Sequence, residues 1–298
     1  MARQYEFRPA KAAQRRMIVD ACRRLTAISA LDQYQYVGFG GLEFIDFVEF
    51  HRGLGIPLMT SIERDTNIQH RLEFNKPYNS IRVLMGEARD QLPQVDWTKL
   101  SITWLDYTDV LTTDILRDLD YVVRSSVPGS IVIVTVNGAA TGVPLPNRLE
   151  NLREKLGDLI GDGLNASDMN GWGPVQVERS VLQAKAHSVG RDAHGRPFRQ
   201  LFNVHYADDA KMLTWGGIVT SASLDRTIDA CRFEDLDFVR TGDEAFEINV
   251  PVLTEREITY LEAELVGSAT GVMPKIKGVE AKDIKAFAQV YRWRVGTR

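Results

Sequence analysis

Gly38 and Gly40 mark the first point at which the chain could bind a ligand through its backbone. They end the aromatic and β-branched run 34–39 and precede 42–52, whose apolar spacing predicts a helix. Because glycine has no Cβ, a ligand can approach the main chain there, and the start of the helix carries partial positive charge. The pattern favours a cofactor-binding turn, although such glycines also serve as a plain strand-to-helix turn.

Acidic residues follow the next two expected strands. Glu63 comes directly after 57–62, where an acid accepts hydrogen bonds from both ribose hydroxyls of an adenosine-type cofactor. Glu87 and Ala88 follow 81–85, where a polar and a small side chain would line an adenine pocket. Each of these acids alone also fits an ordinary surface position, but their recurrence at strand ends predicts a nucleoside-binding edge.

Asp106 and Tyr107 end the strand expected at 100–105, at the edge where ligands bind in open α/β sheets. An enzyme that transfers an activated group to a hydroxyl or amine orients the acceptor and removes a proton. We expect Asp106 to act as that base, with Tyr107 beside the reacting group. His205 is a second candidate, although a half-buried strand histidine with a backbone partner explains it more simply.

Strands and helices alternate in the segments that position these residues. Apolar runs such as 130–136 are typical of strands covered on both faces, and they predict a parallel sheet. The segments 199–206 and 212–220 have hairpin spacing and would close the sheet with an antiparallel pair. The first helix, expected within 9–30, would carry its arginines on its outer face. The remaining expected strands are 34–39, 57–62, 81–85, 100–105 and 246–250, and the remaining expected helices are 42–52, 65–74, 112–125, 148–159, 177–187, 254–265 and 281–291.

This order of elements resembles the class I S-adenosylmethionine-dependent methyltransferases over roughly residues 30–220. The shared features are the glycine turn, the strand-end acids, the Gly-Glu-Ala sequence at 86–88 and the closing hairpin. The resemblance implies a Rossmann-like fold and the transfer of a methyl group from S-adenosylmethionine to an oxygen or nitrogen. By position, Gly38 and Gly40 would hold the methionine part, Glu63 the ribose and Glu87 with Ala88 the adenine, while Asp106 and Tyr107 would flank the transferred methyl group.

The expected fold class is therefore α/β, with a doubly wound, mainly parallel sheet, a terminal antiparallel hairpin and a small helical C-terminal module. Residues 1–30 would form an N-terminal helix, and residues 31–222 a Rossmann-like cofactor-binding domain with an insertion at 143–197. Residues 223–298 would form the C-terminal module, in which Thr254 and Glu257 have the spacing of a helix capping box.

One departure from the family pattern, and one feature shared with another enzyme class, keep other functions open. The chain has Tyr36 and Val37 where the family has an acid before its glycines, which fits a non-catalytic, methyltransferase-like subunit that binds or regulates a complex. A nicotinamide-dependent oxidoreductase also needs a glycine turn and a ribose-binding acid. Its third glycine is replaced here by Glu43, which would crowd the pyrophosphate, so a methyltransferase is the better interpretation.

Composition favours an ordinary globular protein. The 298 residues are 44% hydrophobic and 26% charged, with a net charge of −4, which does not indicate a nucleic-acid binder. The longest apolar run is far shorter than the roughly 20 residues of a membrane-spanning helix. The two cysteines, Cys22 and Cys231, and the five scattered histidines provide no disulfide framework and no metal-ligand spacing. We expect a cytoplasmic protein with neither a metal site nor a membrane association.

Both ends of the chain are basic, which the net charge conceals. Arginines and lysines outnumber acids in 1–24 and again in 275–298. If the terminal helices pack together, their cations with Tyr291 and Trp293 could bind nucleic acid. Two solvated helix faces explain the same residues more simply. A protein partner is a further expectation that the sequence does not specify.

Overall fold

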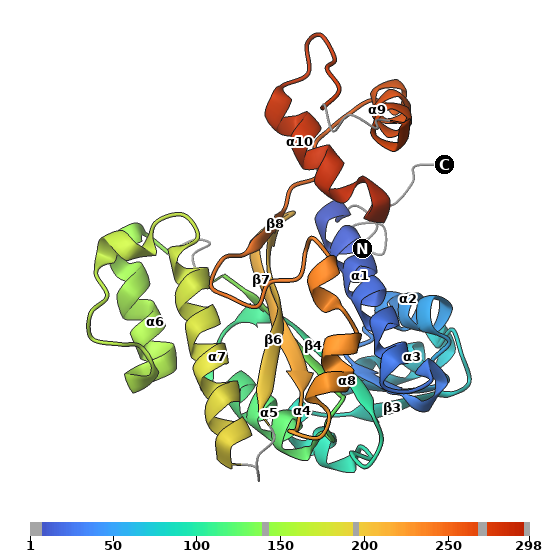
Figure 1. Ribbon diagram of the computed structural model, residues 1–298. Coiled ribbons are helices and arrows are strands. Elements are labelled where there is room, and N and C mark those ends of the chain that lie inside the picture. The colour runs from blue at the N-terminus through green and yellow to red at the C-terminus, as the bar shows by residue number, and fades with distance from the viewer. Residues whose placement is uncertain (1–7, 139–142, 193–196, 268–272, 295–298) are drawn as a thin grey trace.

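The computed structural model describes residues 8–138, 143–192, 197–267 and 273–294, which form an eight-stranded sheet between two layers of helices (Figure 1). The strand order is β3-β2-β1-β4-β5-β7-β6-β8. The strands are β1 (Gln35–Gly38), β2 (Leu58–Glu63), β3 (Ile81–Met85), β4 (Ser101–Val110), β5 (Ile131–Asn137), β6 (Phe198–Ala207), β7 (Lys211–Val219) and β8 (Phe246–Ile248).

The direction of the strands follows the expected pattern. Strands β1 to β5 pair in parallel, whereas β7 is antiparallel to both β5 and β6. Apolar side chains point to both faces of β5, so this central strand is buried along its length. The prediction of a doubly wound, mainly parallel sheet closed by an antiparallel hairpin is confirmed.

Helices cover both faces of the sheet. They are α1 (Pro9–Arg23), α2 (Ile45–Leu54), α3 (Gln69–Asn75), α4 (Ala88–Gln91), α5 (Thr113–Ser125), α6 (Arg148–Leu156), α7 (Gly173–Asp192), α8 (Asp225–Ala230), α9 (Glu255–Gly267) and α10 (Ala281–Val290). One face packs against α1, α2, α3 and α8, and the other against α5, α6 and α7. Within the described part of the chain, none of these helices is long and apolar enough to cross a bilayer.

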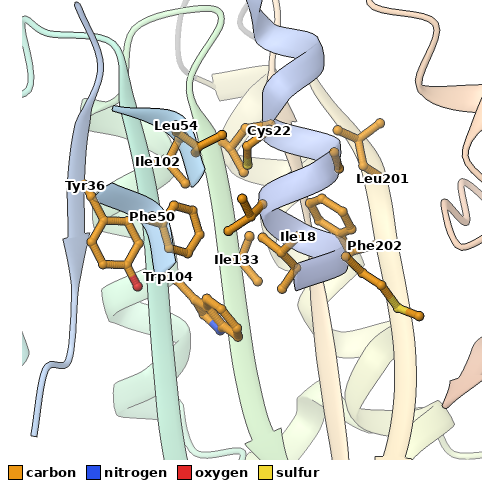
Figure 2. Close-up of a cluster of buried hydrophobic side chains, with 14 of the residues drawn as sticks. Ile18, Cys22, Tyr36, Phe50, Leu54, Ile102, Trp104, Ile133, Leu201 and Phe202 are labelled. Atoms are coloured by element: carbon orange, nitrogen blue, oxygen red, sulfur yellow. The ribbon is translucent and has the colours of Figure 1, made fainter. Parts of the chain in front are cut away.

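Helix α1 is part of the larger core and not an appendage. Its Ile18 and Cys22 are buried against the sheet, as Figure 2 shows, where they lie among side chains of α2 and the central strands. Trp104 on β4 and Phe202 on β6 are fully or almost fully buried in the same cluster. The helix expected within 9–30 therefore belongs to the core of the main sheet.

Helix α2 begins three residues later than its apolar pattern predicts. Phe44, just before the helix, has a left-handed backbone with φ of 49°, and Gly41 has φ of 51°. A bulky residue in this region is strained, so the surrounding packing must hold it there. Phe44 is completely buried and contacts Phe47 edge-on, which supplies that packing. The helix therefore starts at Ile45, and the preceding loop is held away from helical geometry.

The boundary expected at residue 222 does not separate two cores. Strand β8 joins the main sheet in parallel with β6, and Ile228 of α8 is buried in the same cluster as α1. Among the described residues, a small separate cluster lies around α9 and α10, where Leu261, Ile284 and Phe287 pack together. The predicted capping box is present, because the Thr254 amide donates to Glu257 and the Glu257 amide donates to Thr254.

The first turn of α1 is capped by a distant residue. No side chain at its own N-terminus caps the helix, which begins with Pro9. Instead, the carboxylate of Asp208, in the turn between β6 and β7, accepts the backbone N–H groups of Ala10 at 3.1 Å and Lys11 at 3.0 Å. A carboxylate at this position also interacts favourably with the helix dipole. The hairpin turn therefore fixes where α1 starts.

We predict that Asp208→Ala lowers the free energy of unfolding by roughly 0.5–2 kcal/mol, the usual cost of losing a helix cap. Asp209→Ala is the matched control, because the neighbouring Asp209 is 78% exposed and only pairs with Arg8 at the surface. An exposed pair contributes about 0–1 kcal/mol. Urea denaturation of both variants measures the difference, and equal losses would show that the cap does not stabilise α1.

Candidate functional site

A cavity of about 920 Å³ lies at the carboxyl ends of the parallel strands. Its walls come from parts of the chain that are distant in sequence. These are the loop after β1 with the start of α2, the ends of β2 and β4, the first two turns of α1 and the β6–β7 hairpin, together with Arg71 and Asn75 of α3 and Asn137 at the end of β5. Strand order explains the location, since β1 and β4 are neighbours from which the chain continues in opposite directions across the sheet.

Four of the residues predicted from the sequence line this one cavity. They are Gly40, Glu63, Asp106 and Tyr107. Gly40 follows β1, and Glu63 is the last residue of β2. Strand β4 was expected to end before Asp106, but it continues through Asp106 and Tyr107 to Val110. The structure thus brings together the glycine turn, one strand-end acid and the β4 segment.

Gly38, Glu87 and Ala88 lie outside the lining of the cavity. A Cβ on Gly38 would be 2.8 Å from the Tyr36 hydroxyl and 3.2 Å from the Trp104 carbonyl oxygen, so this glycine allows close packing inside the sheet. Ala88 packs against the core on the α5 side. Their proposed roles toward the cofactor find no support in the position of the cavity.

The glycine turn has the form needed for an adenosyl cofactor. A Cβ on Gly40 would lie 2.6 Å from Ser61 Oγ, which itself accepts the Gly40 N–H at 3.1 Å. Gly41, which the sequence reasoning did not select, lines the cavity with a left-handed φ and would meet nothing within 4 Å of a Cβ. The main chain is therefore exposed to the cavity here, and Glu63 shares the same cavity. These features fit the expected cofactor.

Asp106 forms a buried ion pair with Lys11 of α1. Lys11 Nζ lies 2.6 Å from Asp106 Oδ1, and the two side chains are 7% and 20% exposed. The ammonium also lies 4.5 Å from the centroid of the Trp104 ring. The residue that the sequence put forward as the base thus has a lysine partner that the sequence reasoning missed.

A second buried pair lies on the same wall of the cavity. Arg15, one helical turn after Lys11, donates to Asp46 in the first turn of α2. Burial alone would lower the pKa of Arg15, but Asp46 and Asp106 outweigh burial and raise that pKa. The expectation that the arginines of this helix face outward is wrong for Arg15, which is 8% exposed.

The sequence contains an indication that Lys11 and Arg15 are buried. They precede Ile18 and Cys22 at helical spacing, so they continue the apolar stripe of α1 toward its N-terminus. Charged residues in line with an apolar stripe are buried only when they are paired. Their partners come from α2 and β4, and no local pattern could identify these.

Tyr107 is a poor proton donor or acceptor for the cavity. Its hydroxyl donates to Asp118 of α5 at 2.6 Å, on the opposite side of the sheet from Lys11. Burial, and then the charge of Asp118, raises the pKa of Tyr107 far above its usual value. Its ring packs edge-on against Phe39, with centroids 5.0 Å apart, so Tyr107 contributes an aromatic wall.

His205 is buried away from the cavity. Its ring stacks on Trp172 with centroids 4.8 Å apart, and Nε2 has no hydrogen-bond partner. Burial, and to a smaller extent Arg179, lowers the pKa of His205 from 6.5 to about 4. The imidazole is therefore neutral near pH 7, but it does not reach the cavity lining.

The two basic ends of the chain do meet. Trp293 in the last turn (η10, Tyr291–Trp293) donates its indole N–H to Asp20 of α1 at 3.3 Å, and Arg16 donates to the carbonyl of Arg294. Trp293 is 8% exposed, and the ring of Tyr291 stacks on Phe287. Trp293 is thus packed inside the protein, and binding of nucleic acid stays a prediction from the sequence alone.

Among the described residues, no group of three or more histidine, cysteine, aspartate or glutamate side chains could hold a metal ion.

Comparison with known proteins gives one match in sequence. The family model described as "Putative O-methyltransferase" matches residues 3–294, a span that includes the sheet, the cavity and both terminal helices. No curated protein matches the chain in sequence.

Solved structures show a weaker similarity. The O-methyltransferase TomG from Streptomyces achromogenes, in complex with SAM (S-adenosylmethionine), has 16% identity and a TM-score of 0.39, over 71% of this chain and 88% of that one. Human N-acetylserotonin methyltransferase, also in complex with SAM, has 13% identity and a TM-score of 0.36, over 68% of this chain and 52% of that one.

We predict that His205→Phe makes the free energy of unfolding less dependent on pH. The pKa of His205 is about 4 in the folded protein and near 6.5 when unfolded. The unfolded chain therefore binds an extra proton between these values, and stability is lost as pH falls through this window. Phenylalanine preserves the stack on Trp172 and cannot titrate. Urea denaturation at pH 7 and pH 5 tests this, and an unchanged slope would contradict the prediction.

Proposed function

The chain belongs to the family described as "Putative O-methyltransferase". We therefore propose that it methylates a hydroxyl group of a small acceptor bound in the cavity at the carboxyl ends of β1 and β4. The family confirms the class of enzyme expected from the sequence, an S-adenosylmethionine-dependent methyltransferase. It also removes the nicotinamide-dependent oxidoreductase from consideration.

The observation that carries the proposal is that Gly40, Glu63 and Asp106 line one cavity. When bound, S-adenosylmethionine supplies a methyl group on a positively charged sulfur. An acceptor oxygen can displace this sulfur from the methyl carbon. In the proposed arrangement, the exposed backbone at Gly40 and Gly41 binds the amino-acid part, and Glu63 accepts hydrogen bonds from the ribose. Asp106 then lies beside the reacting groups at the end of β4.

The size of the cavity favours a small acceptor. Its volume is near the upper end of the roughly 300–1,000 Å³ typical of ligand pockets, which suits a cofactor together with a modest second molecule. Phe39, Tyr107 and Tyr206 supply aromatic wall, and α1 with the β6–β7 hairpin closes one side. Aromatic walls favour a flat acceptor, such as a phenol, over an extended polymer.

We also propose a cytoplasmic location. Cys22 and Cys231 are both free and buried, as is usual for proteins of a reducing compartment. A nucleic-acid or protein partner plays no part in the proposed reaction.

We predict that S-adenosylmethionine binds the purified protein and that Glu63→Ala weakens binding by about 10- to 100-fold. This is the loss expected when hydrogen bonds to a charged group, worth roughly 1.5–3 kcal/mol, are removed. Isothermal titration calorimetry gives both dissociation constants. Glu87→Ala is the matched control, because Glu87 also follows a strand but lies outside the cavity lining, and it should bind normally.

A measurement of turnover distinguishes an active methyltransferase from a non-catalytic, regulatory subunit. Release of S-adenosylhomocysteine in the presence of a panel of small phenols would support the proposed function. Binding of S-adenosylmethionine without turnover on any hydroxyl acceptor would favour the regulatory subunit. Absence of binding would contradict the proposal, as would binding of NADH in its place.

A further inference from the structure

Lys11 is the most enclosed cation in the lining of the cavity. Its side chain is 7% exposed, and Nζ lies 2.6 Å from Asp106 Oδ1 and 4.5 Å from the centre of the Trp104 ring. The Tyr206 ring is 5.7 Å away on another side. The amine is thus held among a carboxylate and two aromatic rings at the end of β4, where the reaction is proposed to occur.

Interactions along α1 fix the position of this amine. Asp208 accepts the backbone N–H of Lys11 itself, and Gln14, three residues later, donates to Thr214 of β7. Thr214 in turn shares a hydrogen bond with Thr135, which accepts the indole N–H of Trp104 at 2.9 Å. Both the lysine and the ring beneath it are therefore positioned by the same set of hydrogen bonds.

The groups around Lys11 have opposite effects on its pKa. Burial lowers the pKa of Lys11, Asp106 of β4 raises it, and Arg15 of α1 lowers it again. Asp46 of α2 also raises the pKa, but the net direction is downward. The remaining neighbours are Tyr206 of β6, itself held neutral by burial, and the carboxylate of Asp208 at the backbone. A lowered pKa favours the neutral amine, the form in which a lysine acts as a base.

We propose that Lys11 is the general base of the methyl transfer and that Asp106 orients its amine and stabilises the ammonium that forms. This inference rests on the proposed function. The acceptor O–H gives its proton to Lys11 Nζ as its oxygen forms a bond to the methyl carbon. The carbon–sulfur bond breaks with its electron pair on sulfur, so the products are the methyl ether, S-adenosylhomocysteine and a Lys11 ammonium paired with Asp106.

Other candidate bases are less suited to this role. The Tyr107 hydroxyl donates its hydrogen bond to Asp118, and His205 lies outside the cavity lining. Glu63 accepts the Asp65 N–H at 2.9 Å at the end of β2, where the ribose is proposed to bind. Lys11 with Asp106 resembles other amine or imidazole bases that a carboxylate orients, in which the carboxylate stabilises the protonated form.

The positive sulfur provides a test that needs no acceptor. A sulfonium in the cavity repels an ammonium nearby, so bound S-adenosylmethionine should favour the neutral amine of Lys11. S-adenosylhomocysteine has the same adenosine and amino-acid parts but a neutral sulfur, so it should have a smaller effect. The ¹³Cε shift of Lys11, in protein labelled with [¹³C]lysine, reports the ionisation directly, and the signal missing from Lys11→Arg assigns it.

Lys185 provides the matched control. It pairs with Asp120 at the same distance of 2.6 Å, but its side chain is 31% exposed and lies outside the cavity. Lys185→Arg assigns its signal, and neither ligand should change the position of that signal. Lys11→Arg keeps a cation beside Asp106, so the variant used for assignment preserves the buried charge pair.

The expected result is a titration midpoint for Lys11 that is lower by about one pH unit or more in the S-adenosylmethionine complex than in the S-adenosylhomocysteine complex. A Lys11 that stays ammonium up to pH 9 in the S-adenosylmethionine complex would overturn the role as base, while leaving the proposed function intact. If calorimetry shows that S-adenosylmethionine does not bind, both proposals fail.

Discussion

Two buried ion pairs join the first helix to the rest of the protein. Lys11 with Asp106 and Arg15 with Asp46 place four charges in an interior where each would be costly alone. Their removal from water is offset only when each charge keeps its partner, so α1 has one acceptable position, across β4 and α2. The cap from Asp208 sets the same position from the hairpin side. The position of α1 over the cavity is thus set by electrostatic pairing as well as by the apolar contacts of Ile18 and Cys22.

The strands were predictable because their signal is local. Apolar runs such as β5 must be strands of a covered sheet, and acids at successive strand ends must meet at one edge of a parallel sheet. This reasoning placed Gly40, Glu63 and Asp106 together without knowledge of the structure. Gly38, Glu87 and Ala88 lie outside the lining of this cavity, because membership of a strand-end motif does not fix which side chains reach it, and their roles toward the cofactor stay predictions.

The contribution of α1 could not be predicted, since it depends on tertiary partners. Lys11 and Arg15 read as solvated cations, and only the positions of Asp106 and Asp46 in the fold make them interior residues. The same limit applies to β8, whose partner β6 lies about forty residues earlier in the chain and whose pairing ties 223–298 to the main sheet. The strain at Phe44 is likewise a property of packing around α2 and not of its sequence.

The cap on α1 also orders events during synthesis. Lys11 leaves the ribosome early, yet its amide must wait for Asp208, which lies 197 positions further along the chain. Contacts of such long sequence separation form late, because the intervening chain must first be brought together. A nascent chain that lacks the hairpin leaves the backbone N–H groups of Ala10 and Lys11 without their cap. The first helix to be made therefore receives its cap only after the hairpin has been translated, and the lining of the cavity is complete only then.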